Sequence, residues 1–409
     1  MKKALLLINS SSGLYDFRGG LIKRLVAEGY DVLCGVPDDL CVKELRGLGA
    51  RVVRTDINRR GMNPVQDVKL FRGYRALIRK EKPDVVLTYT IKPNIYGGYA
   101  ARREGVPYIA TLTGLGSMFQ ECVRGESAGT GTMTHFSLRR EQPLMSAEKR
   151  VIVPVPHDSP LQRLVTAMYR TALKECACVF FQNEENRSVF EMLRIPSGKT
   201  RLVNGSGVDL ERHLPEGYPG HAETEVTTFL YVGRLMREKG SIDLLRAMER
   251  LHDEAPGSVC LQTVGYTEQG EQDAADELQV LTERALSAGY LTQHPYDTDI
   301  HPYYTAADAV VMPSYHEGMS NVLMEASATA RPVLASDIPG CREAVEDGAT
   351  GFLFPARDTD ALYDAMRRFV RLPVAERRMM GAAARRKMEA QFDRAAVVDA
   401  YMEEIRACT

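Results

Sequence analysis

Short apolar runs of strand length alternate with helical stretches along both halves of the sequence, and this alternation limits the possible folds more than any other feature. In the first half the runs cover residues 4–8, 32–35, 51–54, 85–89, 108–112, 179–181 and 201–203. In the second half they cover residues 229–232, 259–264, 309–312, 333–335 and 351–354. Strands separated by helices build parallel sheets. The pattern therefore predicts an α/β protein with two parallel sheets that bind ligands at the carboxyl ends of their strands.

The chain is long enough to bury two cores, because it has 409 residues of which 44% are hydrophobic. We predict a first domain over residues 1–204 and a second over residues 205–392. Three helical stretches close the sequence, at residues 360–371, 374–391 and 394–407.

The segment from Pro313 to Ala326 carries two glutamates, Glu317 and Glu325, across an expected junction of loop and helix. Eight helical residues span roughly 12 Å, so the two carboxylates can meet opposite ends of one sugar-diphosphate-ribose ligand. The first amides of the helix, from Gly318 to Val322, have no partner within it and suit a diphosphate. The plain alternative is an amphipathic helix with two solvated glutamates.

A second loop carries two cations. The strand that ends at Gly233 is followed by Arg234 and, five residues later, by Lys239 before a helix. An arginine fork and a lysine point charge together can neutralise the charge of a departing nucleoside diphosphate. Alone this is a weak signal, but it is strong beside the glutamate pair.

These motifs resemble the family 4 type of retaining glycosyltransferases with the GT-B fold, in which two Rossmann-like domains face each other across a cleft. The resemblance rests on V-G-R-L-x-x-E-K-G at residues 232–240, the glutamate pair, and the segments 204–209 and 338–344. It implies that Arg234, Lys239 and Glu317 are catalytic, with the two cations on the phosphates, Glu317 on the donor sugar and Glu325 on the ribose. It also implies a last helix, residues 393–409, that crosses back to the first domain. The candidate donor-binding residues are Gly233, Gly318, Met319, Ser320, Asn321, Val322, Glu325 and, by position near the base, His294.

Three segments of the first half resemble bacterial enzymes that extend undecaprenyl-diphosphate-linked sugars. They are Asn9–Arg18, Thr90–Gly97 and Thr111–Gly116. The serine and glycine loop after the first strand, with Arg18, is expected to bind an acceptor diphosphate or to cap the donor, unless it is a plain turn. The candidate acceptor residues are Ser12, Gly13, Tyr15, Arg18, Lys92, Asn94, Thr113 and Gly114. Thr113 and Gly114 stand where many family members carry a histidine, and His316 is the histidine closest to the donor motif.

The two halves of the chain differ in charge. Residues 1–205 carry 32 Lys and Arg against 20 Asp and Glu, whereas residues 206–409 carry 20 against 34. A basic first half predicts an anionic partner, such as a membrane surface or a diphosphate-linked lipid acceptor. No nucleic-acid-binding motif accompanies these cations, so nucleic acid is not an expected partner.

The stretch at about 119–159 is polar and longer than usual loops, so we expect an insertion in the first domain. It is either a lid that contacts a membrane or the acceptor, or a disordered segment without a role. No run of about 18 apolar residues is present, and residues 1–8 are too short for a signal peptide. We therefore expect a cytoplasmic protein, peripheral at the inner face of the plasma membrane.

No metal or cofactor is expected. The eight cysteines lack metal-site spacing and several lie in apolar strands. Two Asp-x-Asp tripeptides, at residues 297–299 and 358–360, are the alternative, because metal-dependent glycosyltransferases of another fold use this motif. The sequence shows no carboxylate nucleophile for a double displacement, so we favour a same-face displacement in which the leaving phosphate helps to deprotonate the acceptor.

The favoured function is transfer of a hexose or N-acetylhexosamine from a nucleotide sugar to a polyprenyl-diphosphate-linked saccharide, in the synthesis of a bacterial surface glycan or a glycoprotein glycan. UDP-GalNAc, UDP-GlcNAc and UDP-galactose are the expected donors. A nucleotide-sugar epimerase of related fold and a non-catalytic sugar-nucleotide-binding protein are the alternatives.

Overall fold

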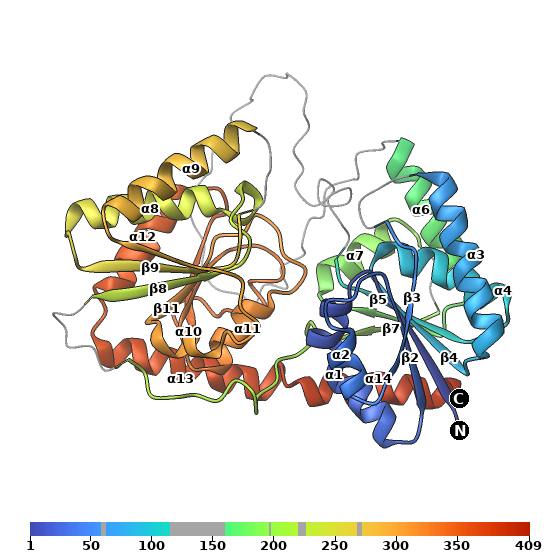
Figure 1. The fold of residues 1–409 in the computed structure, drawn as a ribbon. Helices are drawn as coiled ribbons and strands as arrows, with labels where there is room; N and C mark the ends of the chain where they lie inside the picture. The colour runs from blue at the N-terminus through green and yellow to red at the C-terminus, as the bar shows by residue number, and fades with distance from the viewer. Residues whose placement is uncertain (59–62, 115–159, 196–197, 220–225, 268–271) are drawn as a thin grey trace, which may run out of the picture.

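The structure is a computed structural model that describes residues 1–58, 63–114, 160–195, 198–219, 226–267 and 272–409. Two separate parallel sheets organise these residues, and helices cover both faces of each sheet (Figure 1). We call the part built on the first sheet the N-terminal domain and the part built on the second the C-terminal domain. The insertion predicted at about 119–159 lies outside the described residues.

The sheet of the N-terminal domain has the order β3-β2-β1-β4-β5-β6-β7, with every neighbouring pair parallel. Its strands are β1 (Lys3–Leu7), β2 (Asp31–Val36), β3 (Arg51–Arg54), β4 (Val85–Tyr89), β5 (Tyr108–Leu112), β6 (Cys178–Phe181) and β7 (Lys199–Leu202). Alternate residues of β1 enter opposite cores: Ala4 and Leu6 pack on one face, and Leu5 and Leu7 on the other. This two-sided burial explains the continuous apolar runs in the sequence.

Helices of the N-terminal domain divide between the two faces of its sheet. One face is covered by α1 (Ser11–Ala27), α2 (Val42–Gly47) and the last helix, α14 (Arg394–Cys408). The opposite face is covered by α3 (Pro64–Glu81), the π-helical turn η1 (Pro93–Gly97), α4 (Gly98–Arg103), α6 (Pro160–Ala172) and α7 (Glu184–Met192).

The sheet of the C-terminal domain repeats this plan with the order β10-β9-β8-β11-β12-β13. Its strands are β8 (Thr227–Val232), β9 (Val259–Val264), β10 (Leu291–His294), β11 (Ala309–Met312), β12 (Val333–Ser336) and β13 (Gly351–Phe354). The helices of this domain are η2 (Arg237–Lys239), α8 (Ser241–Glu254), α9 (Gln272–Ser287), α10 (His301–Ala306), α11 (Asn321–Ala328), α12 (Thr359–Val370) and α13 (Val374–Gln391). The prediction of two parallel sheets is confirmed, although β10 was not predicted.

The chain passes between the domains at two places, and the two passing segments pair with each other. The Val208 amide donates to the Phe392 carbonyl at 2.8 Å, and the Arg394 amide donates to the Val208 carbonyl at 3.0 Å. Gly207 has a φ of 65°, and a Cβ there would lie 2.5 Å from the Cα of Arg394. Only glycine therefore permits this close approach.

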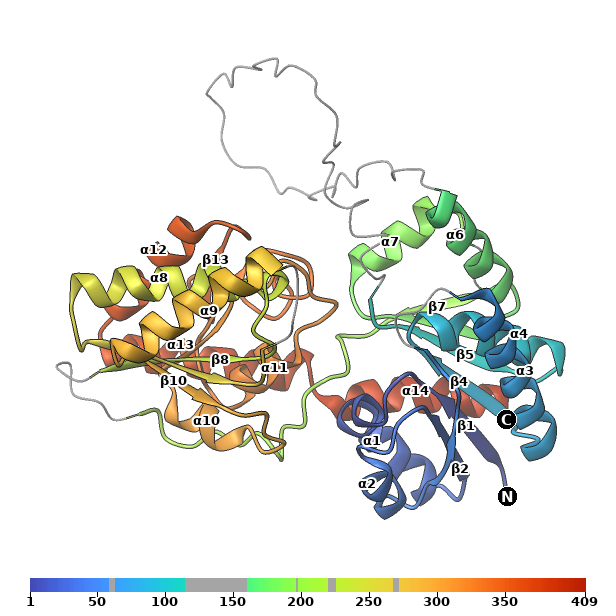
Figure 2. The same cartoon turned by 45° about the horizontal axis from the view of Figure 1, so that its top comes forward.

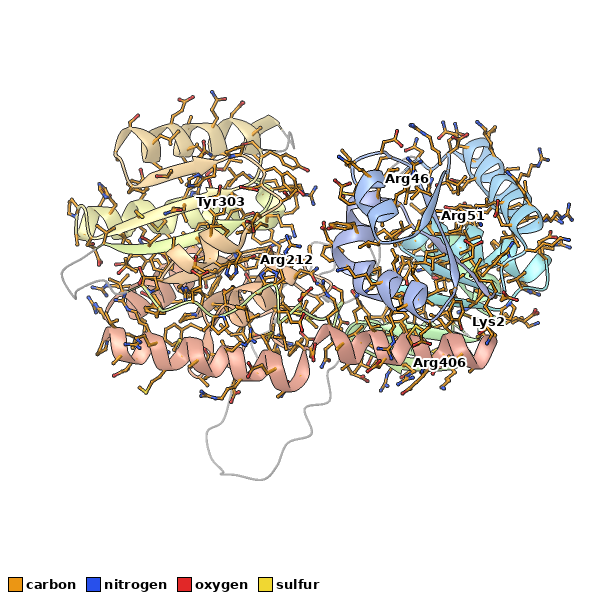
Figure 3. The ribbon with its side chains drawn as sticks, turned by 60° about the horizontal axis from the view of Figure 1, so that its bottom comes forward. Lys2, Arg46, Arg51, Arg212, Tyr303 and Arg406 are labelled. Carbon is orange, nitrogen blue, oxygen red and sulfur yellow. The ribbon has the colours of Figure 1, made fainter. Side chains whose placement is uncertain are left out.

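After its pairing with Val208, the chain returns to the N-terminal domain as α14. This helix lies beneath the N-terminal domain, on the same side of the molecule on which α13 lies beneath the C-terminal domain (Figure 3). Tyr401, which is fully buried, stacks on Phe180 with ring centroids 4.1 Å apart, and its hydroxyl lies 2.8 Å from Oγ1 of Thr111. The last residues of the sequence thus complete the core of the first domain.

Candidate functional site

The two loops of the predicted donor motif leave neighbouring strands of the C-terminal sheet. Strands β8 and β11 are paired in parallel at the point where the strand order reverses. Loops at such a switch point diverge from the carboxyl edge and bind ligands in open α/β sheets. The Gly233–Lys239 loop follows β8 and the Pro313–Gly318 loop follows β11.

The two loops contact each other directly. Lys239 Nζ lies 2.6 Å from Oε1 of Glu317, and both side chains are largely buried. The Tyr315 amide donates to the Glu238 carbonyl at 3.0 Å. Gly240 has a φ of 69°, and a Cβ at this position would lie 2.1 Å from the Pro313 carbonyl oxygen. The structure therefore brings Lys239 and Glu317 together as the sequence predicts.

Arg234 lies at the start of the same loop, directly after Gly233. Its carbonyl accepts a hydrogen bond of 2.7 Å from the hydroxyl of Tyr231, which is fully buried in β8. Gly233 has a φ of 152°, a conformation that favours glycine. A Cβ added at Gly265 would lie only 2.1 Å from the Gly233 carbonyl oxygen. The backbone that carries Arg234 is thus fixed by packing against the loop after β9.

The helix that follows Glu317 begins at Asn321, three residues after Gly318, the first of the amides we expected to face a ligand. Ser320 is the N-cap of α11, and its Oγ accepts from the Leu323 amide at 3.4 Å. The Ser320 amide donates to the Gly340 carbonyl at 3.1 Å. The prediction that the Ser320 amide faces the ligand is therefore wrong for this structure, because the loop after β12 already uses it. The amides of Asn321 and Val322, in the first turn, have no partner within the helix.

Glu325 lies on α11, and its environment favours the neutral acid. Burial raises the pKa of its carboxyl to about 7, although the Tyr304 hydroxyl, together with Arg394 and Arg212, opposes the rise. Tyr304 is fully buried in α10 and donates to Oε2 of Glu325 at 3.0 Å. Tyr304 was not predicted, because it lies 21 positions from Glu325 in a short helix without a motif.

His294 ends β10, the edge strand of the C-terminal sheet, at the same carboxyl edge as the loop after β9. Its carbonyl accepts from the Gly265 amide at 3.1 Å, and its ring packs on that of Tyr303 with centroids 4.9 Å apart. Figure 3 shows Tyr303 on the C-terminal domain, and Arg212 closer to the other domain. His294 is therefore attached to the β9 loop that supports Gly233, which suits a position near a base.

The N-terminal domain approaches the donor motif at Gly318. A Cβ on Gly318 would lie 2.3 Å from the Thr113 carbonyl oxygen, so only a hydrogen fits between the two backbones. Asn183, at the N-cap of α7, donates from Nδ2 to the Gly318 carbonyl at 2.6 Å. Thr113 and Gly114, which were predicted to face the acceptor, thus lie beside the donor loop. Asn183 was missed, although an Asn between a buried strand and a helix is a recognisable capping signal.

Four predicted acceptor residues lie on α1. We expected a serine and glycine loop here, but the helix already begins at Ser11. Ser12, Gly13 and Tyr15 are half-buried in its first turns. Ser10 is the N-cap: its Oγ accepts from the Gly13 amide at 3.4 Å and lies 2.9 Å from Oγ of Ser12.

Arg18 was predicted to bind the acceptor, but the structure places it in the core of the N-terminal domain. The side chain of Arg18 is only 4% exposed, and its guanidinium lies 5.0 Å from the ring centroid of Tyr89 and 5.4 Å from that of Tyr401. The helical period places Arg18 on the same face as the buried Leu14 and Ile22. The half-buried charge on this helix is Asp16, where burial raises the pKa and nearby Arg212 and Arg394 lower it.

Asn94 and Lys92 also have structural partners. Asn94 is fully buried, and its Nδ2 donates to the Thr111 carbonyl at 2.8 Å, which anchors the end of β5. Asn94 was predicted to contact the acceptor, but in this structure its side chain is buried in the N-terminal domain. Lys92 pairs with Asp67 at 2.7 Å.

Both Asp-x-Asp tripeptides have local structural roles. Asp297 Oδ1 accepts from the Asp299 amide at 2.9 Å in a turn. Asp358 is the N-cap of α12, and Asp360 pairs with Arg250. Among the described residues, no group of three or more His, Cys, Asp or Glu is arranged to hold a metal ion.

Two protein families match this chain. Residues 226–371 match the family described as "Glycosyl transferases group 1", and residues 3–147 match the family described as "Glycosyl transferase 4-like". The first match covers the strands and loops that carry the donor motif, and the second covers β1 to β5. The two matches together span most of both domains.

Relatives and solved structures extend this likeness. The chain is 23% identical over 359 residues to N,N'-diacetylbacillosaminyl-diphospho-undecaprenol alpha-1,3-N-acetylgalactosaminyltransferase of Campylobacter jejuni; the aligned region covers 84% of this chain and 83% of that protein. It is 36% identical over 166 residues to glycogen synthase of Mycobacterium tuberculosis; this aligned region covers 40% of this chain and 38% of that protein. Sucrose-phosphate synthase from Thermosynechococcus elongatus has a TM-score of 0.76 at 20% identity, with 100% and 99% of the two chains covered. HepE of Anabaena, in complex with UDP and glucose, has a TM-score of 0.74 at 17% identity, with both chains fully covered.

Proposed function

Because the chain belongs to the family 4 glycosyltransferases of the GT-B fold, we propose that it transfers a hexose or N-acetylhexosamine from a UDP-sugar to a polyprenyl-diphosphate-linked saccharide. The observation that carries the donor half of this proposal is the contact between Lys239 and Glu317 at the switch point of the C-terminal sheet. It joins a cation for the diphosphate and a carboxylate for sugar hydroxyls in one place. The Campylobacter relative, whose name specifies a diphospho-undecaprenol acceptor, supports the acceptor half.

We assign the roles at the donor as follows. Arg234 and Lys239 bind the phosphates, and the amides of Asn321 and Val322 at the start of α11 add positive potential. Glu317 holds sugar hydroxyls and Glu325 holds the ribose. UDP complexes of HepE support a uridine nucleotide as the donor, although HepE shares only the fold.

The transfer proceeds with retention of the anomeric configuration, by same-face displacement. Each carboxylate of the donor motif is engaged in a contact that suits binding better than nucleophilic attack: Glu317 pairs with Lys239, and Glu325 accepts from Tyr304. The leaving phosphate oxygen takes up the proton of the acceptor hydroxyl as the new glycosidic bond forms. Arg234 and Lys239 stabilise the charge that develops on the leaving diphosphate, and this role makes a metal ion unnecessary.

The acceptor's lipid requires an approach to a membrane, and the N-terminal domain offers a suitable face. Val65 on α3 and Leu164 on α6 are 77% and 57% exposed, and both helices pack against η1 and α4 (Figure 2). Exposed Lys69 and Arg72 lie on α3 beside Val65. Apolar side chains next to cations suit an anionic lipid surface. No helix among the described residues is long and apolar enough to cross a membrane.

Incubation with radiolabelled UDP-sugars and GDP-sugars, with and without a polyprenyl-diphosphate sugar, tests this proposal. We expect label in the lipid fraction with a UDP-sugar only, undiminished by EDTA, and NMR of the product should show the anomeric configuration of the donor. Isomerised free donor would identify an epimerase instead, and binding without turnover would identify a non-catalytic protein.

A further inference from the structure

Asn183 is placed to act on the donor loop from the other domain. It follows β6 in the N-terminal domain and is only 3% exposed. Its Oδ1 accepts from the Asn186 amide at 2.8 Å and so caps α7. Its Nδ2 donates to the Gly318 carbonyl at 2.6 Å. One side chain therefore joins the two domains at the residue directly after Glu317.

The capping role alone does not require an asparagine. Asp, Ser and Asn all cap helices well, because each offers an oxygen to the first amides. Only the amide side chain also offers a hydrogen-bond donor at its second atom. Because Oδ1 is held by α7, the orientation of the amide is determined, and the donor must face Gly318. The bond to Gly318 is thus the contact that distinguishes Asn183 from an ordinary cap.

The bond also orients the peptide unit that leads into α11. In a trans peptide the C=O and the following N–H point in opposite directions. When the Gly318 carbonyl points toward Asn183, the Met319 N–H points away from the N-terminal domain. The same loop is held at Glu317 by Lys239 and at Ser320 by the Gly340 carbonyl. Of these three contacts, only the bond from Asn183 comes from the N-terminal domain.

We infer that Asn183 is a positioning residue through which the N-terminal domain sets the place of Glu317 and of the first amides of α11 for the donor. This inference rests on the proposed donor site. Without Nδ2 of Asn183, the Gly318 carbonyl loses its hydrogen-bond partner, although its backbone still packs between Thr113 and Gly340. The loop is then free to shift. Donor binding and turnover then suffer while the fold of each domain is kept.

The test compares Asn183→Ser with Asn63→Ser. Serine keeps a neutral cap at α7 but cannot reach Gly318, and Asn63 caps α3 through the Val65 amide. We expect Asn183→Ser to lower kcat/KM for the UDP-sugar about tenfold, as the loss of one hydrogen bond would, while Asn63→Ser does not. The midpoints of thermal unfolding of the two variants should agree within about 2 °C.

Hydrogen exchange gives a readout that does not depend on activity. In Asn183→Ser the amides of residues 318–324 should exchange faster than in wild type, whereas those of α7 should keep their protection. Faster exchange in α7 with unchanged exchange at residues 318–324 would show that Asn183 only caps α7, and this would overturn the inference. Kinetics of Asn183→Ser equal to those of Asn63→Ser would also overturn it. If the wild type transfers no sugar at all, the proposed function fails, and hydrogen exchange still decides whether Asn183 positions the loop.

Discussion

Lys239 Nζ and Glu317 Oε1, which lie 2.6 Å apart, connect the loop after β8 with the loop after β11. The two side chains are 24% and 14% exposed, so water screens their attraction less than at an open surface. The pair therefore holds the two loops together in the structure without a donor. In the proposed donor complex, the diphosphate would compete with Glu317 for Lys239.

Replacement of either cation should impair chemistry more than stability. We expect Lys239→Ala and Arg234→Ala each to lower kcat by about 10² or more, because each removes a group aimed at the charge of the leaving diphosphate. Arg237→Ala is the matched control, since Arg237 lies on the same loop and is half-exposed near Glu277 at 3.9 Å. Steady-state kinetics of the three variants decide the point, and near-normal turnover in both Lys239→Ala and Arg234→Ala would remove these residues from the mechanism.

Donor affinity should depend on pH through Glu325, whose pKa burial raises to about 7. In the proposed donor site the ribose hydroxyls donate to the ionised carboxylate, so KM for the UDP-sugar should rise as the pH falls below about 7. In Tyr304→Phe the midpoint should move to higher pH, because the Tyr304 hydroxyl lowers the pKa of Glu325. A profile measured between about pH 5.5 and 8.5 that is unchanged in Glu325→Gln would disprove this assignment.

The same group has an opposite effect on the unliganded protein. The folded pKa of Glu325 lies above its ordinary value of 4.5, so its contribution to stability is complete below that value and is lost as the pH rises to about 7. The unfolding free energy of the wild type relative to Glu325→Gln should therefore fall over this interval. Denaturant titrations at several pH values measure the difference, and a constant difference would contradict the raised pKa.

Gly318→Ala should disrupt the contact between the two domains at Thr113. Its Cβ would meet the Thr113 carbonyl oxygen at 2.3 Å, and backbone cannot yield as a flexible side chain does. We expect a loss of more than tenfold in kcat/KM with little change in the stability of either domain. Gly217→Ala is the control, because Gly217 is not a predicted site residue and a Cβ there has no described atom within 4 Å.

Arg18 should contribute to stability and not to acceptor binding. Arg18→Ala removes a buried side chain from between Tyr89 and Tyr401, so we expect the unfolding free energy to drop by about 2–4 kcal/mol with KM for the acceptor unchanged. Arg24→Ala, at a side chain that is 48% exposed, should cost much less. A raised acceptor KM at full stability would restore Arg18 to the acceptor site.

Binding to vesicles should depend on the exposed apolar residues of the N-terminal domain. We expect Val65→Glu combined with Leu164→Glu to reduce co-sedimentation with anionic vesicles at least tenfold, because each change adds a negative charge and removes apolar contact. Leu286→Glu, on α9 of the C-terminal domain and 44% exposed, should have no effect. Equal sedimentation of all three proteins would exclude this face as the membrane contact.

The sequence predicted the sheets well because most of their strands are buried on both faces and show as unbroken apolar runs. Strand β10 escaped notice because only Leu291 of its four residues is buried, as befits an edge strand. The proximity of the loops after β8 and β11 was predictable for a related reason. Each follows a buried strand directly, and neighbouring parallel strands deliver their loops to one edge.

Residues that depend on helix rotation or on contacts between domains were not predictable. Arg18 and Asp16 are two positions apart, and the exact start of α1 decided which of them entered the core. The contact between Asn183 and Gly318 joins residues 135 positions apart, and no local pattern encodes it. The sequence therefore identified the segment that carries Arg18 but not the face of α1 on which Arg18 lies.

The position of α14 has a consequence for how the protein matures. Val397, Tyr401, Met402 and Ile405 are buried in the core of the first domain, although they are translated after the whole C-terminal domain. A domain that emerges first from the ribosome usually folds first. Here the first domain must wait with an open hydrophobic face until α14 has been synthesised. Loss of α14, by a premature stop codon or by proteolysis, would leave that face uncovered and expose the nascent chain to aggregation.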